Sequence, residues 1–405
     1  MAWRNLWRNP RRSILTLAAI AFATLLLVFM LSWQFGSYET MINAAVRGPT
    51  GHLQVQARDY HEKREIEMVV DDPGAILALA EALPEVAAVT PRAVAFALAA
   101  SDRRTYGTAV LGIDPERENR VSELKKRVRR GDYLAAGAAG QALPGDILAT
   151  NLRAAPGAEV TLLGQGRDGS VAATAVTVAG SFRSGQDVID RATLYLRLDD
   201  FQETFAMAGA VHQVVVVGRS LDEVPRIKAA LQRGIAALGR DRELVVLDWS
   251  ELMPGLLQSI QLDLVSGFIF YLILIVVVAF SILNTFLMVV LERTREFGML
   301  IAIGVTPGRL SRLLLMESAV MTFLGLLAGI LLGSLVTWYY QVHGIEFSGA
   351  AEMLRQFGLP ERMYPRLSLL SIAVGAGLVF VITALTALYP ARRVKRLSPL
   401  EAMKG

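Results

Sequence analysis

Four stretches of the chain contain no Asp, Glu, Lys or Arg, and they constrain the fold more than any other feature. They cover residues 13 to 38, 264 to 291, 318 to 345 and 367 to 391. Each exceeds the roughly 20 residues that a helix, rising about 1.5 Å per residue, needs to cross a hydrocarbon core of about 30 Å. Charged residues make up only 19% of the chain, against roughly 25% in soluble domains. The sequence therefore predicts an α-helical membrane protein with transmembrane helices at residues 13–38, 264–291, 307–340 and 367–391, the last of which should end at Pro390.

The N-terminal segment "MAWRNLWRNPRR" sets two tryptophans and a leucine at helical spacing, opposite arginines. This pattern predicts an interfacial helix at residues 1–12, lying on the inner leaflet. The stretch that follows could instead be a cleavable signal peptide, because Ala21, Phe22 and Ala23 form a small-x-small site after a basic segment. The apolar run continues through "LLLVFMLSW", so cleavage would fall within the membrane, and we expect the segment to be retained.

Basic residues are concentrated in three segments, although the net charge is only +4. Residues 1–12 hold four arginines, residues 392–405 hold five Lys or Arg, and the loop at 292–317 holds Arg293, Arg295, Arg309 and Arg312. The positive-inside rule then predicts that these segments and both termini face the cytoplasm, with residues 39–263 and 341–366 on the other side. A nucleic-acid-binding patch is the alternative interpretation, and the membrane-flanking positions disfavour it. The chain has no cysteine, which excludes disulfides and thiol chemistry.

The long segment between the first two helices alternates strand-like and helix-like patterns. "HLQVQA", "VAAVTPRAVAFALAA" and "HQVVVVG" are typical of strands, whereas "PGAILALAEAL" is typical of a helix with proline in its first turn. Between about residues 105 and 210 short strands separated by turns predominate. We therefore predict a large α+β domain at residues 39–263 with a β-rich insertion.

Known catalytic and metal-binding motifs are absent from the sequence. A phosphate-cradling loop has the pattern G-x-x-x-x-G-K-[ST], yet none of the six lysines follows a glycine. There is no G-x-S-x-G serine elbow and no H-E-x-x-H helix. The four histidines are dispersed, and His61 in "DYHEK" is more typical of a solvated turn than of a metal site. We predict no catalytic residue, no metal site and no enzymatic activity in this chain.

The stretch "LERTREFGMLIAIGVTPGRL", residues 291 to 310, separates two apolar segments and is itself amphipathic. Phe297, Leu300 and Ile301 form an apolar stripe, and Gly304 is typical of a helix C-terminus. The pattern predicts a short separate helix at residues 292–306 on the cytoplasmic side. The residues alone leave two interpretations open, an ordinary interfacial helix or a docking surface for a soluble partner.

Small and polar residues mark the third span. Its start holds Glu317, which we expect to pair with Arg309 or Arg312 at the inner membrane surface. Glycines recur every fourth residue in "GLLAGILLG", which predicts either a close helix-packing face or a dimer seam. These glycines are Gly325, Gly329 and Gly333. In the tail at residues 392–405, "SPLE" resembles a capping box and predicts a further short helix.

The motif "ERTREFGMLIAIGVTPGRLSRLLLMES", followed by a glycine-rich span, resembles the signature of the FtsX-like permeases, also called type VII ABC transporters. The ends "WRNLWRNPRRSILTLAAIAFA" and "YPARRVKRLSPLEAM" are similar to the terminal motifs of that family. In the large domain, "GHLQVQ", "VLGIDPE" and "GSFRSGQDVIDRATLYLRLDDFQ" are similar to its lipoprotein-releasing LolC and LolE members. The resemblance therefore covers the whole chain.

The resemblance implies a permease in the bacterial inner membrane, paired with a second copy or a paralogue and bound to a cytoplasmic ATPase dimer that holds ATP and Mg. The large domain would be periplasmic, and the helix after the second span would be the coupling helix that docks on the ATPase. The residues at or near that contact would be Arg293, Glu296, Phe297, Met299, Leu300, Ile303 and Gly304. The first two spans would pass the motion to the periplasm.

For the substrate, the resemblance implies lipoproteins that are extracted from the inner membrane and released to a periplasmic carrier. MacB-like export of peptides, lipids or antibiotics is the alternative within the family. MacB carries its ATPase fused at the N-terminus, whereas this chain starts at its first span, which favours the lipoprotein-releasing type. A third alternative is FtsX-like signalling to cell-wall hydrolases without transport, and the domain of such proteins is usually much smaller.

Overall fold

The computed structural model describes residues 10–46, 50–102, 104–135, 137–292, 294–346, 349 and 362–395. The predictions for residues 1–9, Arg293 and the tail beyond residue 395 lie outside these ranges. Two compact units make up the chain. The membrane unit comprises Met1–Tyr38, Ser259–Glu346 and Arg362–Gly405, and the α/β unit comprises Glu39–Gln258 and Phe347–Glu361.

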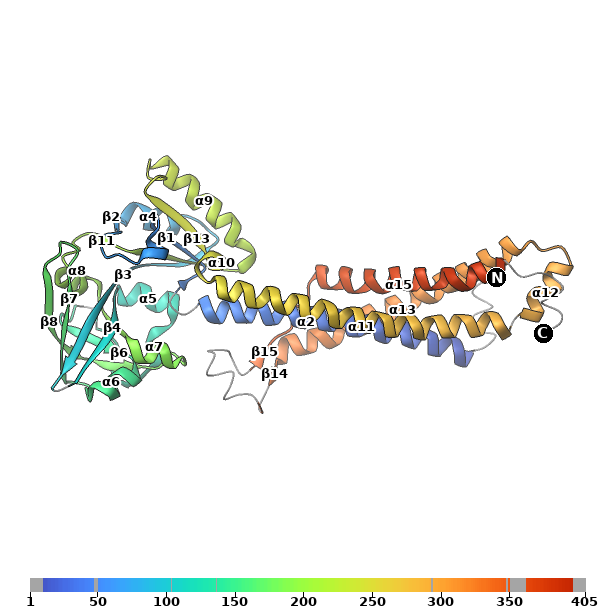
Figure 1. Ribbon diagram of the computed structural model, residues 1–405, viewed down its shortest axis with the longest axis horizontal. Coiled ribbons are helices and arrows are strands. Elements are labelled where there is room, and N and C mark those ends of the chain that lie inside the picture. Colours follow the sequence, from blue (N-terminus) through green and yellow to red (C-terminus); the bar gives the residue numbers. More distant parts are fainter. Residues whose placement is uncertain are drawn as a thin grey trace. The chain divides into compact units, whose positions relative to one another are not determined.

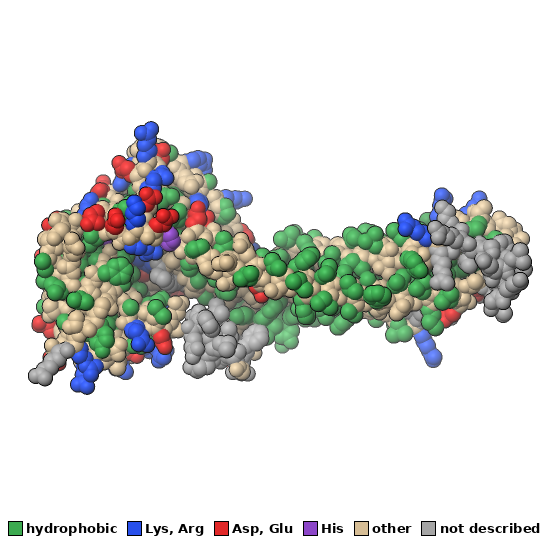
Figure 2. All heavy atoms as spheres, viewed as in Figure 1, with side chains coloured by type: hydrophobic (Ala, Val, Ile, Leu, Met, Phe, Trp, Pro, Cys, Tyr) green, Lys and Arg blue, Asp and Glu red, His purple; other side chains and the backbone are tan. Residues whose placement is uncertain are grey.

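Four long helices of the described residues are apolar and long enough to cross a membrane, as the charge-free stretches predict. They are α2 (Pro10–Ala45), α11 (Pro254–Glu292), α13 (Pro307–His343) and α15 (Leu369–Lys395). Large apolar side chains lie exposed over their surfaces (Figure 2), as expected for helices in contact with lipid. The short helix α12 (Thr294–Ala302) separates α11 from α13, and β14 (Ile345–Glu346) pairs with β15 (Arg362–Met363).

The fourth span does not end at Pro390, contrary to the sequence expectation. Helix α15 continues through this proline to Lys395. A proline inside a helix costs about 3 kcal/mol, because it lacks an N–H and its ring clashes with the preceding turn. Ala391 and Val394 are buried beyond it, and the hydroxyl of Ser311 donates a hydrogen bond to the Ala391 carbonyl at 3.0 Å. These contacts with the rest of the membrane unit offset the cost of the proline.

The α/β unit is built on a βαββαβ arrangement of the ferredoxin-like type (Figure 1). Its elements are β1 (Leu53–Ala57), α4 (Gly74–Glu81), β3 (Val86–Ser101), β12 (Gln213–Gly218), α9 (Val224–Ala237) and β13 (Leu244–Asp248). The four strands lie in the order β13-β1-β12-β3, and every neighbouring pair is antiparallel. Short elements join them: α3 (Tyr60–Lys63), β2 (Val70–Asp71) and η3 (Leu221–Glu223). Helix α10 (Trp249–Leu252) follows β13.

One face of this sheet is covered by α4 and α9, and sequence periodicity explains why. Alternate residues of the strands point to this face, among them Leu53 and Val55 of β1, while α9 buries residues at spacings of three and four. Those residues are Val224, Ile227, Leu231 and Ile235.

The predicted fold class, with four membrane helices and a large domain between the first two, is confirmed.

An insertion between β3 and β12 forms the rest of the unit. It contains β4 (Arg104–Ile113), α5 (Pro115–Ser122), η2 (Leu124–Arg127), β5 (Val128–Gly131), β6 (Gln141–Pro144), α6 (Asp146–Leu152), β7 (Glu159–Gln165), β8 (Val171–Val178), β9 (Gly180–Phe182), α7 (Asp187–Ala192), β10 (Thr193–Arg197), α8 (Leu198–Thr204) and β11 (Ala210–Val211). Strand β3 belongs to both parts, because its first half pairs with β12 and its last residues pair with β7. The strands β3-β4-β10-β6-β8-β7 therefore close into a ring.

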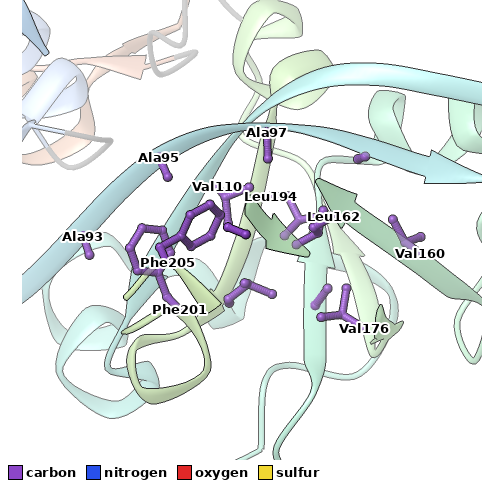
Figure 3. Packing of buried hydrophobic residues seen from close by; sticks show 14 of the residues in the cluster. Ala93, Ala95, Ala97, Val110, Val160, Leu162, Val176, Leu194, Phe201 and Phe205 are labelled. Carbon is purple, nitrogen blue, oxygen red and sulfur yellow. The ribbon is translucent and has the colours of Figure 1, made fainter. Parts of the chain in front are cut away.

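Small residues of β3 line the interior of the ring and leave room for aromatic rings. Alternate positions of β3 that face inward are all alanine, from Ala93 to Ala99. The rings of Phe201 and Phe205, 4.5 Å apart between centroids, fill the space beside them (Figure 3). Gly112 of β4 is required for this packing, since a Cβ atom there would lie 2.6 Å from the Phe201 side chain.

The sheet face away from α4 and α9 carries a fully buried ion pair. Arg92 of β3 donates two hydrogen bonds to Glu118 of α5, from Nε to Oε2 at 2.8 Å and from Nη2 to Oε1 at 2.7 Å. Both side chains are almost completely buried. The bidentate pair of Arg92 and Glu118 fixes the insertion to the ferredoxin-like part. Burial raises the pKa of the Tyr195 hydroxyl to about 12, and the negative charge of the nearby Glu118 carboxylate contributes to this rise.

We expect His212 to make the α/β unit sensitive to acid. Burial lowers the pKa of His212 to about 4, while its Nδ1 accepts a hydrogen bond from the Val94 N–H at 2.9 Å and its Nε2 lies 3.1 Å from the Ile66 carbonyl. The unfolded chain binds a proton below about pH 6.5 and the folded chain does not, so stability is lost as the pH falls from about 6.5 to about 4. We expect a loss of about 3 kcal/mol over this range.

The measurement is the free energy of unfolding of the full chain at pH 6.5 and pH 4, for the native chain and for His212→Gln. The variant cannot titrate at this position, so its pH dependence should be smaller by that amount. An equal pH dependence in both chains would contradict the assignment.

Candidate coupling site

Helix α12 is held to the membrane unit by one face. Phe297 is only 1% exposed and packs in a cluster with Val290 at the end of α11, Leu310 near the start of α13 and Val394 near the end of α15. Ile301, one turn after Phe297, is half-buried against the same cluster. The helix therefore has a fixed position relative to three of the four spans.

The opposite face of α12 exposes apolar side chains. Met299 is 57% exposed and Ile303, the first residue after α12, is 82% exposed, with Leu300 between them. Half-buried Glu296 lies at the start of the same i, i+3, i+4, i+7 stripe. The apolar stripe expected from the sequence is thus divided between two faces, with Phe297 and Ile301 inward and Leu300 outward.

A glycine turn ends α12. Gly304 has a φ of +102°, a conformation that side chains other than glycine rarely adopt. The Val305 N–H donates to the Leu300 carbonyl at 3.0 Å, which satisfies one of the last carbonyls of the helix. Helix α13 then begins at Pro307 with Thr306 at its N-cap position. The exposed stripe therefore lies on a short helix that a glycine turn ends before α13 begins.

The three glycines of α13 lie where this helix packs on α2 of the same chain. A Cβ atom at Gly325 would lie 2.7 Å from Ile20, one at Gly329 would lie 2.6 Å from the Ala21 carbonyl oxygen, and one at Gly333 would lie 3.0 Å from the Leu25 Cα. The third span and the first therefore approach along a face that admits no side chain.

Glu317 is buried in α13, whereas Arg309 and Arg312 are exposed near the start of this helix. The Ser318 hydroxyl beside Glu317 donates to the Leu314 carbonyl at 2.9 Å. Glu317 has polar contacts in the structure, and its pairing with either arginine stays a prediction.

A cluster of polar side chains joins α2 and α11, and the sequence did not predict it. Gln34 donates to the Tyr38 hydroxyl at 2.7 Å, Tyr38 donates to Asp263 at 2.6 Å, and Tyr271 donates to the Gln34 side-chain oxygen at 2.8 Å. An amide inside an otherwise apolar span is the sequence signal that would have identified Gln34. The cluster joins the first two spans, which are also joined by apolar packing.

Within the described ranges, no group of three or more His, Cys, Asp or Glu side chains is arranged to hold a metal ion. In the short helix α3, Nδ1 of His61 lies 3.5 Å from the donor Nη2 of Arg64. Burial lowers the pKa of His61.

Comparisons with known proteins give two family matches. The model described as "MacB-like periplasmic core domain" matches residues 13–233, more than half of the chain, and the model described as "FtsX-like permease C-terminal" matches residues 268–399. The chain is similar to the lipoprotein-releasing system transmembrane protein LolC of Neisseria meningitidis serogroup B, with 24% identity over 98% of this chain and 95% of that protein.

The chain is also similar to the macrolide export ATP-binding/permease protein MacB of Chlorobaculum tepidum, with 32% identity over 31% of this chain and 16% of that protein. Among solved structures, the extracellular domain of the ABC-type transporter YknZ from Gram-positive bacteria aligns with 48% of this chain and 99% of its own. Its TM-score is 0.37 and its sequence identity is 16%.

Proposed function

Because the chain belongs to the family of FtsX-like permeases that carry a MacB-like periplasmic core domain, we propose that it converts the ATP-driven motion of a separate subunit into the release of lipoproteins. The family makes it an ABC transporter permease of the inner membrane, one that works with a cytoplasmic ATPase and pairs with a second permease. In homologues of this kind the ATPase activity lies in the partner subunit.

The observation that carries the coupling proposal is the division of α12 into two faces. A partner that docks on Met299, Leu300 and Ile303 pushes on a helix that Phe297 fixes to three spans. Exposed apolar side chains on a rigid helix are typical of a docking surface. The proposal sets α12 and both termini in the cytoplasm and the α/β unit in the periplasm, as the basic residues predict.

The substrate proposal is supported by similarity along almost the full length of LolC, a protein whose name describes a lipoprotein-releasing system. The similarity to MacB covers 31% of this chain. We therefore propose acylated lipoproteins as the substrate and a soluble periplasmic carrier as the acceptor. MacB-like export of peptides, lipids or antibiotics is the alternative.

To test the docking face, Met299→Glu and Ile303→Glu place charges on the exposed stripe of α12 and leave the Phe297 cluster intact. We expect the affinity for the cognate ATPase to fall at least about tenfold, because buried apolar contacts dominate such interfaces. Copurification and the ATP hydrolysis rate of the reconstituted complex measure the effect.

The matched control is Leu238→Glu, which places the same charge on an exposed apolar residue of the α/β unit. It should leave copurification unchanged. If both variants copurify fully with the ATPase and support full ATP hydrolysis, α12 is not the docking surface.

To test the substrate, the permease pair and its ATPase are reconstituted in proteoliposomes with an acylated lipoprotein or its unacylated form. We expect ATP hydrolysis to rise several-fold with the acylated form alone, and the lipoprotein to appear with a soluble carrier. Stimulation by peptides or macrolides in its place would support MacB-like export. ATP-dependent activation of a cell-wall hydrolase without any transport would support FtsX-like signalling.

A further inference from the structure

The open face of the sheet in the α/β unit forms the floor of a cavity. Two cross-strand rows run over β3, β4 and β10 on this face. One row is Val94, Leu111 and Tyr195, and the other is Phe96, Ala109 and Thr193. All six residues line a cavity of about 320 Å³, a volume in the range of small-molecule sites.

The walls of this cavity combine apolar and polar side chains. Leu124 of η2, Phe182 of β9 and Ile189 of α7 give it an apolar side, and Gln54 of β1 and Gln213 of β12 give it a polar one. These segments come from both the ferredoxin-like part and the insertion. The cavity is therefore a product of the way the two parts are joined.

The ionisable residues that line the cavity are all basic. They are His61, Arg64 and Arg127, apart from the phenol of Tyr195, and no Asp or Glu is among the described lining residues. Arg64 donates from Nε to the His61 carbonyl at 3.1 Å, and Arg127 donates from Nη1 to the Ser184 carbonyl at 3.3 Å. Within the described part of the chain, neither arginine forms a salt bridge with a carboxylate. Asp190 lies behind Ser184, whose hydroxyl donates to it at 2.6 Å, and it does not line the cavity.

An apolar surface continues outward from the cavity. Phe96 is 68% exposed, and Leu98 and Leu163, which face each other across β3 and β7, are 48% and 46% exposed. These three residues and Ala109 line a second hollow, and Phe96 and Ala109 line both hollows. Large exposed apolar side chains gathered in one place are typical of a binding surface.

We propose that this cavity binds an amphiphile that has an anionic group and a hydrocarbon chain. The anionic group lies by the guanidinium groups of Arg64 and Arg127, where charge-assisted hydrogen bonds hold it. The chain lies over Phe96, Ala109 and Leu111 and reaches the outer hollow at Leu98. The proposal concerns a ligand of the α/β unit itself and stands apart from the identity of the transported substrate.

The test uses the full chain in nanodiscs without the ATPase, and its lack of cysteine allows single thiols to be placed. Ala109→Cys places a thiol in the cavity, and Ser170→Cys places one at the exposed turn between β7 and β8. Palmitate is the probe, and the rate of modification by a maleimide is the readout. At ten times its dissociation constant, palmitate should slow modification of Ala109→Cys about tenfold and leave Ser170→Cys unchanged.

Two further comparisons test the anionic group. In the Ala109→Cys chain, Arg64→Gln with Arg127→Gln should raise the palmitate concentration for half-protection at least about tenfold. The matched control is Arg129→Gln, because Arg129 is an exposed arginine two residues after Arg127 and does not line the cavity. This variant should leave the palmitate concentration for half-protection unchanged. Equal protection by palmitate and by uncharged 1-hexadecanol, or no protection by palmitate, would overturn the proposal.

The lipid composition of the nanodiscs distinguishes the source of the amphiphile. Protection of Ala109→Cys in discs that contain an anionic phospholipid, without added palmitate, assigns the ligand to the membrane. Protection that needs added palmitate assigns it to free fatty acids. Since no ATPase or lipoprotein is present, the result does not depend on the proposed transport function.

Discussion

Replacing Glu118 with leucine is expected to lower the free energy of unfolding of the α/β unit by about 3 to 5 kcal/mol. The substitution leaves the Arg92 guanidinium buried without the two hydrogen bonds that it donates at 2.7 and 2.8 Å. A buried charge that loses its carboxylate partner pays a large part of its desolvation cost. Hydrogen exchange of the β3 and β4 amides, measured in the full chain, reports the change.

The control is the double variant Arg92→Met with Glu118→Leu. Replacing both members of a buried ion pair by apolar residues of similar size is often nearly neutral, so the double variant should recover most of the loss. A surface pair gives the second comparison, because removing Glu123 from its exposed contact with Lys126 should cost less than about 1 kcal/mol. Additive losses in the double variant would show that the two side chains act independently.

The second large effect is expected at Gly329. A Cβ atom there would lie 2.5 Å from the Thr24 Cβ, 2.6 Å from the Ala21 carbonyl oxygen and 3.1 Å from the Ala21 Cα. Two of these neighbours are backbone atoms, which cannot rotate away. Gly329→Ala should therefore force α13 and α2 apart and cost about 1 to 3 kcal/mol, and Gly329→Leu should cost more.

Thermal unfolding of the detergent-solubilised chain measures this cost. Gly377→Ala is the matched control in α15, since nothing lies within 4 Å of a Cβ atom built there. This control should be neutral or slightly stabilising, because alanine favours a helix over glycine. If the Gly329→Ala chain unfolds at the same temperature as the native chain, the close packing of the first and third spans is refuted.

The sequence predicted those strands and helices that have a clear local pattern of apolar and polar residues. The strands β1, β3 and β12 and the helix α4 follow segments whose strand-like or helix-like patterns predict them. Strand β6 lies in the Gly/Ala-rich segment at residues 131–145, which carries no such pattern. Pro390 was misread because the burial of Val394, a tertiary contact, outweighs the intrinsic effect of proline on a helix.

The candidate site was predicted only in outline. The position of α12 follows from its amphipathic pattern and from Gly304, but that pattern placed Phe297 and Leu300 on one stripe. Packing against α11, α13 and α15 buries Phe297 and leaves Leu300 exposed. Residues that are distant in sequence therefore decide which apolar side chains of α12 are buried and which are exposed.

The sequence by itself determined the four spans, the α+β class of the large domain with its β-rich insertion, and the family, because length, composition, periodicity and contiguous motifs are local properties of the chain. Tertiary structure alone decided what happens between segments: the sharing of β3, the Arg92 and Glu118 pair, the basic cavity, and the hydrogen bond from Tyr38 to Asp263, 225 positions apart. Each of these depends on register and helix approach, which bring together residues that no local pattern connects.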